Sequence, residues 1–246
     1  MKRLTIIFLA LFLPAVVPAA GGDQHMMHAD VDLSDRQSLQ RGARLFVNYC
    51  LSCHSAAYMR YNRMGEDLGI PEKVLKENFM FGTDKVGDTM TVSMNREDGE
   101  QFFGIAPPDL SVTARARGAD WLYTYLMTFY RDPSKSQGVN NLAFKDVGMP
   151  HVLWKLQGWQ RPVYHEETAD DGSVSKKIDH LELETPGQLS EQEYADTVRD
   201  LVNFMVYLGE PIKLQRSKIG AWVMVYLFVL LIIVYLLKKE YWRDVH

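Results

Sequence analysis

Cys50-Leu51-Ser52-Cys53-His54 is the stretch around which the rest of this sequence is organised. Two thiols three positions apart on one helical turn can both reach the vinyl groups of a single porphyrin, and the histidine that follows lies under its iron. A disulfide-exchange pair would not need His54, and a zinc site needs four ligands, whereas the chain has only two cysteines. The pattern predicts one covalent haem c, with His54 as an iron ligand.

The second axial ligand of that iron is a soft donor or another imidazole, and a methionine thioether suits electron transfer. Met149 is the first choice among 12 methionines, because Gly148 and Pro150 flank it in a loop that can lie against a haem face. His151 is its main rival. Weaker candidates are Met80, Met90 and Met94. The choice matters because an iron with both axial positions filled carries electrons and does not bind oxygen or peroxide.

A Pro-Pro-Asp-Leu-Ser stretch begins at Pro107 and Pro108. Two prolines make a stiff, extended segment without backbone donors, which either packs on a haem edge or forms a plain loop. Arg115 and Arg117 follow it. A guanidinium can bind a haem propionate through two hydrogen bonds, and the alternative for either arginine is a solvated surface charge.

The first twenty residues have the pattern of an export signal. Lys2 and Arg3 precede an apolar run, and small residues allow cleavage after Ala19 or Ala20. An uncleaved anchor is the alternative interpretation of residues 1–20.

Residues 219–237 are uncharged and long enough to span a bilayer. A buried core helix would need a polar face, which this segment lacks. Residues 213–218 form a predicted juxtamembrane linker and residues 238–246 a cytoplasmic tail. Basic residues flank both ends of the span, so the export signal sets the orientation. It places the predicted haem domain, residues 21–212, in the periplasm, anchored to the inner membrane by a single pass.

Helical periodicity accompanies the cysteine motif. Ser34 and Gln37 are spaced as a capping box for a helix that leads into it. Its apolar face comprises Leu39, Ala43, Phe46 and Cys50. Further helices are predicted near residues 71–78, over 119–130, and from a Ser190–Glu193 capping box to about Leu208. The polar segment 165–187, with a turn signal at 170–172, is predicted to be a surface hairpin or a flexible excursion.

The order of these features resembles the cytochrome c1 family, which provides the haem c subunit of the bacterial ubiquinol–cytochrome c reductase (cytochrome bc1) complex. The matching motifs are Cys-x-x-Cys-His-Ser, Pro-Pro-Asp-Leu-Ser followed by Arg-Ala-Arg, Gly-Met-Pro, a capped helix ending in Gly-Glu-Pro, and one C-terminal span. The resemblance implies a mainly α, cytochrome c-like haem domain with extended loops, plus one C-terminal transmembrane helix. Two departures are the single proline after Met149 and the unmatched segment 154–187.

The resemblance also implies roles for particular residues. Cys50 and Cys53 would hold the haem, and His54 and Met149 would ligate its iron. Arg117 would meet a propionate, Trp121 would be an aromatic neighbour of the haem, and Pro107 and Pro108 would pack beside the ring.

The function implied by the family is electron transfer. The subunit would take one electron from a Rieske iron–sulfur protein and pass it to a soluble or membrane-bound cytochrome c, in a complex with cytochrome b and the lipid membrane. The isolated chain is then a carrier, and the complex is the enzyme. Rival interpretations are a tethered electron shuttle serving a terminal oxidase, and a peroxidase with an open iron position.

Charge narrows the choice of partner. The net charge of −4 gives no support to a nucleic-acid partner. Acidic side chains between residues 166 and 184 either steer a cationic partner or form a solvated acidic loop. They are Glu166, Glu167, Asp170, Asp171, Glu182 and Glu184.

Overall fold

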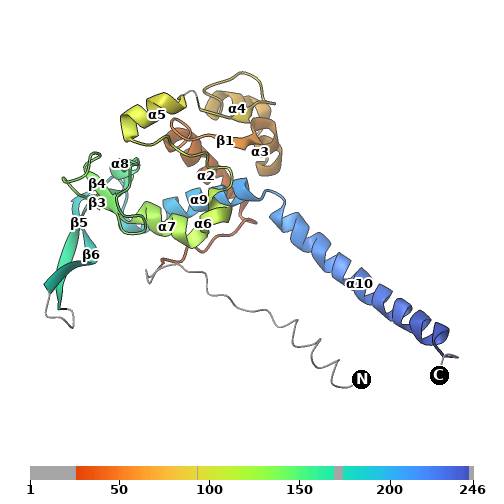
Figure 1. The fold of residues 1–246 in the computed structure, drawn as a ribbon. Helices are drawn as coiled ribbons and strands as arrows, with labels where there is room; N and C mark the ends of the chain where they lie inside the picture. The colour runs from red at the N-terminus through yellow and green to blue at the C-terminus, as the bar shows by residue number, and fades with distance from the viewer. Residues whose placement is uncertain (1–25, 93, 169–173, 244–246) are drawn as a thin grey trace.

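A computed structural model describes residues 26–92, 94–168 and 174–243. The predicted export signal, residues 1–20, lies outside them. The described chain is mainly helical, and one long apolar helix leaves the domain at its C-terminal end (Figure 1). This confirms the predicted fold class.

Helix α2, Arg36–Tyr49, leads into the cysteine motif as predicted, but its N-cap is Asp35. The Asp35 carboxylate accepts a hydrogen bond from the N–H of Ser38 at 3.0 Å. Ser34, the predicted cap, instead donates its N–H and its hydroxyl to Asp32. The prediction was wrong by one residue because both neighbouring side chains are good caps.

The core is built on the packing of α2 against α9, Glu191–Gly209. The predicted capping box of α9 is present, formed by Ser190 and Glu193. The two helices approach closely at Gly42, where a Cβ would lie 2.1 Å from the carbonyl oxygen of Asp200. The Asp200 carboxylate accepts two hydrogen bonds from the guanidinium of Arg41, at 2.5 and 2.9 Å. A buried contact and an ion pair therefore hold α2 on α9.

Short elements cover this pair on one side. They are β1 (Ala56–Arg60), α3 (Tyr61–Leu68), α4 (Glu72–Asn78), β2 (Thr89–Met90) and α5 (Arg96–Phe103). β1 and β2 pair antiparallel. The helix expected near residues 71–78 is present as α4. The sequence did not indicate α5, which is capped by Asn95 through a 2.8 Å bond from the N–H of Asp98.

The predicted helix over residues 119–130 is shorter in the structure. α6 spans Thr113–Arg117 and α7 spans Ala119–Met127. The chain then forms β3, Phe129–Arg131, which pairs antiparallel with β4, Val139–Asn141. Phe129 and Tyr130 are aromatic residues that favour strands once a partner strand is available. The sequence alone did not reveal that partner.

Segment 154–187 contains α8, Trp154–Gln157, followed by a long hairpin of β5, Gly158–Thr168, and β6, Val174–Pro186. A hairpin was one of the two interpretations of this region, and it begins earlier than expected. Its predicted turn lies outside the described residues. In Figure 1 the hairpin and the C-terminal helix extend from opposite sides of the domain.

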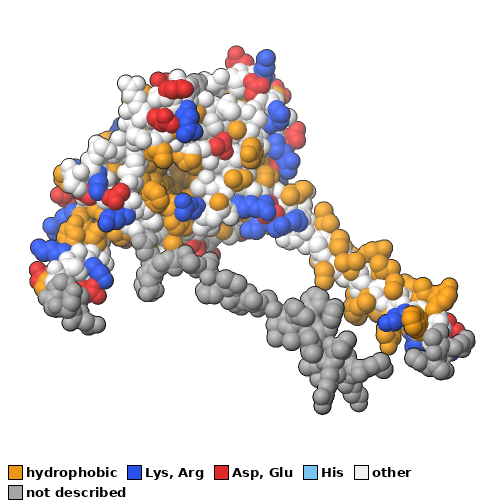
Figure 2. Space-filling model, viewed as in Figure 1, with side chains coloured by type: hydrophobic (Ala, Val, Ile, Leu, Met, Phe, Trp, Pro, Cys, Tyr) orange, Lys and Arg blue, Asp and Glu red, His pale blue; other side chains and the backbone are white. Residues whose placement is uncertain are grey.

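α10 runs without interruption from Lys213 to Tyr241. None of its residues is buried, and hydrophobic side chains cover its surface (Figure 2). Its 29 residues exceed the roughly 20 that a bilayer requires. The segment predicted as a juxtamembrane linker, residues 213–218, is the first part of this helix.

Candidate functional site

The cysteine motif forms a tight turn that continues from the end of α2. The N–H of Cys50 donates to the carbonyl oxygen of Phe46 at 2.8 Å, and the N–H groups of Cys53 and His54 donate to the carbonyl oxygen of Cys50 at 3.0 and 2.8 Å. Both cysteines are free thiols. Burial raises the pKa of Cys50 to about 12, so its sulfur stays uncharged. Two thiols and one imidazole therefore gather on a single turn.

The His54 imidazole is held in one tautomer. Its Nδ1 lies 2.7 Å from the carbonyl oxygen of Pro108, which only accepts hydrogen bonds, so Nδ1 carries the proton. Burial lowers the pKa of His54 and favours the neutral ring. Nε2 then keeps its lone pair. A neutral imidazole whose Nδ1–H is bound to a carbonyl is the usual form of a metal-ligating histidine.

The Pro-Pro-Asp-Leu-Ser segment, residues 107–111, lies against the chain that follows His54. Pro107 packs on α5 at Gly99, where a Cβ would come within 2.7 Å of the proline ring. Three further hydrogen bonds connect the segment to residues 55–58. They run from the N–H of Ala57 to Asp109 Oδ2 (2.9 Å), from the N–H of Leu110 to the carbonyl oxygen of Ser55 (2.8 Å), and from the N–H of Tyr58 to Ser111 Oγ (3.1 Å). The two motifs therefore form one structural unit.

The Met149 loop reaches the same segment from another direction. A Cβ on Gly148 would lie 3.2 Å from both Ile105 Cγ2 and the carbonyl oxygen of Phe103. Residues 103–108 thus contact the methionine loop at one end and His54 at the other. Figure 2 shows a hollow rimmed by hydrophobic side chains on this face, between the regions of α5 and α7.

Met149 is half-buried, and its Sδ lies 3.3 Å from the hydroxyl of Tyr125. Two buried asparagines order the preceding loop. Asn141 donates its amide to the carbonyl oxygen of Tyr125 at 2.7 Å, and Asn140 Oδ1 accepts from the N–H of Asp146 at 2.8 Å. The loop carrying the methionine is therefore tied to α7.

His151, the rival ligand, is enclosed and only 5 % exposed. Its ring stacks on Phe129 with 4.9 Å between centroids, and Trp159 meets it edge-on at 5.9 Å. Burial lowers its pKa to about 4. Met80 and Met90 are also buried in the main core. Met94 is half-buried, as Met149 is, so the burial of the side chains separates Met149 from His151, Met80 and Met90.

Arg117 and Trp121 lie near the same cluster. The Arg117 guanidinium lies over the Trp121 ring, 5.0 Å from its centroid, and Arg117 remains exposed. Trp121 stacks on Tyr125 with 5.1 Å between centroids. The structure thus connects both residues to Met149 through Tyr125. Pro108, whose carbonyl oxygen accepts from His54, is exposed.

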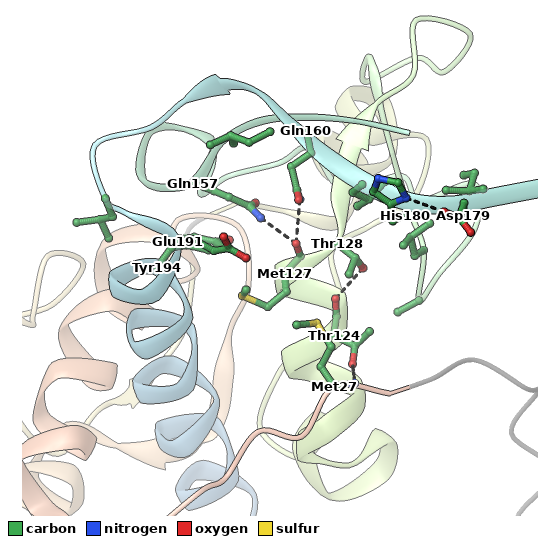
Figure 3. A pocket seen from close by; sticks show the side chains of 16 residues that line it. Met27, Thr124, Met127, Thr128, Gln157, Gln160, Asp179, His180, Glu191 and Tyr194 are labelled. Carbon is green, nitrogen blue, oxygen red and sulfur yellow. Dashed lines mark hydrogen bonds and ion pairs between the residues drawn. The ribbon is translucent and has the colours of Figure 1, made fainter. Parts of the chain in front are cut away.

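A separate cleft of about 600 Å³ lies between the β5–β6 hairpin and helices α7 and α9 (Figure 3). Gln157 and Gln160 both donate to the carbonyl oxygen of Met127 there, at 2.8 and 2.9 Å. None of the residues predicted to contact haem lines this cleft. Its polar contacts attach the hairpin to α7.

Sequence reasoning missed several residues that build the site. Tyr125 falls within the helix predicted over residues 119–130, but no sequence pattern indicates its contact with Met149 or the roles of Asn140 and Asn141. The asparagine pair follows Gly138, which is a turn signal, but its bonds depend on residues far away in the sequence.

The sequence model of the Cytochrome C1 family matches residues 27–245. A cytochrome c1 from Allochromatium vinosum is 48% identical over the whole of both chains. A Nitrosomonas europaea protein named ammonia monooxygenase gamma subunit is 46% identical, again over the whole of both chains. A cytochrome c1 from Rhodospirillum rubrum is 25% identical over 98% of each chain.

The fold, the cysteine–histidine turn and these matches define a membrane-anchored c-type cytochrome. More particularly, the chain belongs to the cytochrome c1 family. Members of this family carry covalent haem c and serve as electron-transfer subunits of the cytochrome bc1 complex, beside cytochrome b and the Rieske protein.

Proposed function

We propose that this chain accepts one electron at a time from the Rieske iron–sulfur protein and passes it to a soluble or membrane-bound cytochrome c. The observation that carries the proposal is the state of His54. Its Nδ1–H is bound to Pro108, and its Nε2 has no hydrogen-bond partner among the described residues, immediately after two free thiols. That donor set fits a single covalent haem c.

Four side chains would hold the haem. Cys50 and Cys53 would form its thioether bonds, His54 Nε2 would bind one side of the iron, and Met149 Sδ would bind the other. A haem with this ligation supplies one-electron redox chemistry. The chain's own contribution is placement and burial, and the proposed electron transfer needs no general acid or nucleophile from it.

The surrounding residues complete the site. Arg117 would pair with a propionate, since it is exposed and its position is restrained by the Trp121 ring. Trp121 would be an aromatic neighbour of the haem. Pro107 and Pro108 would pack beside the porphyrin, where they also hold the carbonyl that orients His54.

The proposed topology follows from the two ends of the chain. Residues 1–20 act as an export signal, the haem domain of residues 21–212 lies in the periplasm, and residues 219–237 cross the inner membrane. Residues 238–246 remain in the cytoplasm. The exposed, apolar surface of α10 supports the crossing.

Electrostatic steering by the hairpin has less support than its composition suggested. Glu182 pairs with Arg161 at 2.8 Å, Glu184 pairs with Arg131 at 3.2 Å, and Glu167 pairs with Lys177. These ion pairs cancel much of the local negative charge. We therefore interpret the described part of this acidic region as a solvated, internally paired surface.

Co-purification tests the assignment. An affinity-tagged full chain is isolated from its native membranes in mild detergent, and its partners and quinol–cytochrome c reductase activity are measured. The proposal expects cytochrome b and the Rieske protein in equal amounts with the chain, and activity in the same fraction. Isolation with a terminal oxidase and without cytochrome b would instead support the tethered shuttle.

A further inference from the structure

We propose that Tyr125 is a positioning residue that acts through Met149: its hydroxyl hydrogen-bonds the thioether sulfur and so raises the redox potential of the site. The inference rests on the proposed function, because it takes Met149 as the distal ligand. Tyr125 lies on α7, outside the cysteine–histidine turn and outside the Pro-Pro segment.

The direction of this hydrogen bond is set by chemistry. The Tyr125 oxygen lies 3.3 Å from Met149 Sδ. A thioether has no proton to give, so the phenol is the donor and the sulfur is the acceptor. The sulfur has two lone pairs. One can bind a metal while the other accepts the hydrogen bond, so the two interactions are compatible.

The Tyr125 ring has little freedom to turn away from the sulfur. Trp121 stacks on it with 5.1 Å between centroids and 13° between planes, and Phe129 meets it at 5.1 Å and 73°. The backbone is restrained as well, because Asn141 donates to the carbonyl oxygen of Tyr125. Aromatic contacts on two sides and a backbone bond thus aim the hydroxyl at Met149.

The hydroxyl has no competing partner among the residues that the structure describes. Its bond to Met149 is the single hydrogen bond that it makes there. Tyr123, two positions earlier on the same helix, points elsewhere and donates to the carbonyl oxygen of Ala195 at 3.4 Å. α7 therefore carries two tyrosines of the same chemistry, and one of them contacts the proposed ligand.

The hydrogen bond changes the donor strength of the sulfur. The phenol proton of Tyr125, shared with the sulfur, would draw electron density from the thioether. The thioether would then stabilise ferric iron less. Ferrous iron depends less on that donation. The oxidised state would thus be disfavoured relative to the reduced state, and the potential would rise, because hydrogen bonds to ligand atoms tune metal sites in this way.

The test compares two single-atom deletions in the purified, full-length, haem-loaded protein, Tyr125→Phe and its matched control Tyr123→Phe. Potentiometric titration in visible light gives the midpoint potential, and the weak long-wavelength methionine–iron band reports the ligand. We expect Tyr125→Phe to retain the band. The equilibrium constant for reduction of its haem should fall three- to tenfold, which lowers the midpoint potential by about 30–60 mV at ~59 mV per tenfold. Tyr123→Phe should leave the potential unchanged.

The outcomes separate this inference from the proposed function. If Tyr125→Phe keeps both the band and the wild-type potential, or if Tyr123→Phe lowers the potential equally, the inference is overturned and Met149 remains the ligand. If the wild-type protein itself lacks the band, both the inference and the ligand assignment are wrong.

Discussion

Asp109 is expected to hold the Pro-Pro segment against the chain that follows His54, and Asp109→Ala tests this. Its carboxylate accepts hydrogen bonds from the N–H of Ala57 at 2.9 Å and from the N–H of Ser111 at 2.8 Å. The first bond joins the Pro-Pro segment to the chain after His54. The second stabilises the turn of the segment itself.

The loss of folding stability expected for Asp109→Ala follows from these two hydrogen bonds. Hydrogen bonds to a charged group contribute more than neutral ones, but Asp109 is exposed, so we take about 1 kcal/mol for each bond. Asp109→Ala should therefore lower the free energy of unfolding by about 2 kcal/mol. Asp109→Asn keeps one oxygen acceptor and should lose roughly half as much.

Urea titration of the purified protein in detergent, followed by tryptophan fluorescence, measures the change as a lower midpoint with an unchanged slope. Asp84→Ala is the matched control, because Asp84 is exposed and makes no hydrogen bond or ion pair within the described chain. Equal midpoints for Asp109→Ala and Asp84→Ala would refute the argument that Asp109 couples the two motifs.

Two further predictions concern contacts that stabilise the domain outside the site. Gly42→Ala places a Cβ 2.1 Å from the carbonyl oxygen of Asp200 and should lower the free energy of unfolding by about 3 kcal/mol, measured in a thermal or urea melt. Gly220→Ala, on the open surface of α10, is the control and should not destabilise the domain. The Asp120 carboxylate accepts a hydrogen bond from the N–H of Ala29, and this bond lowers the pKa of Asp120. The ionised carboxylate therefore stabilises the fold above about pH 4, and this contribution is lost as the pH falls through the lowered pKa. Asp120→Asn should flatten the acid limb of a stability–pH curve, and an unchanged limb would contradict the assigned role.

Local signals predicted much of the fold. The Ser190–Glu193 capping box is present, and the apolar face of α2 is buried at Leu39, Ala43 and Phe46. The uncharged C-terminal run forms one helix. These features are set by residues close together in the sequence, where side-chain period and capping chemistry act directly.

What the sequence did not reveal depends on distant partners. The end of α7 was placed too late because β3 forms only when β4 returns beside it. The Met149–Tyr125 bond joins a loop residue to a helix residue, and no local pattern indicates it. His54 was predicted from its motif, but the carbonyl that orients it belongs to Pro108, far along the chain.

The visible spectrum of the purified full-length protein, compared with that of Met149→Leu, tests the central claim most directly. The claim is that His54 and Met149 together ligate the iron of a haem held by Cys50 and Cys53. It predicts a methionine–iron band in the oxidised wild-type protein and its loss in the variant. A variant spectrum identical to that of the wild type would contradict the claim and make His151 the next residue to examine.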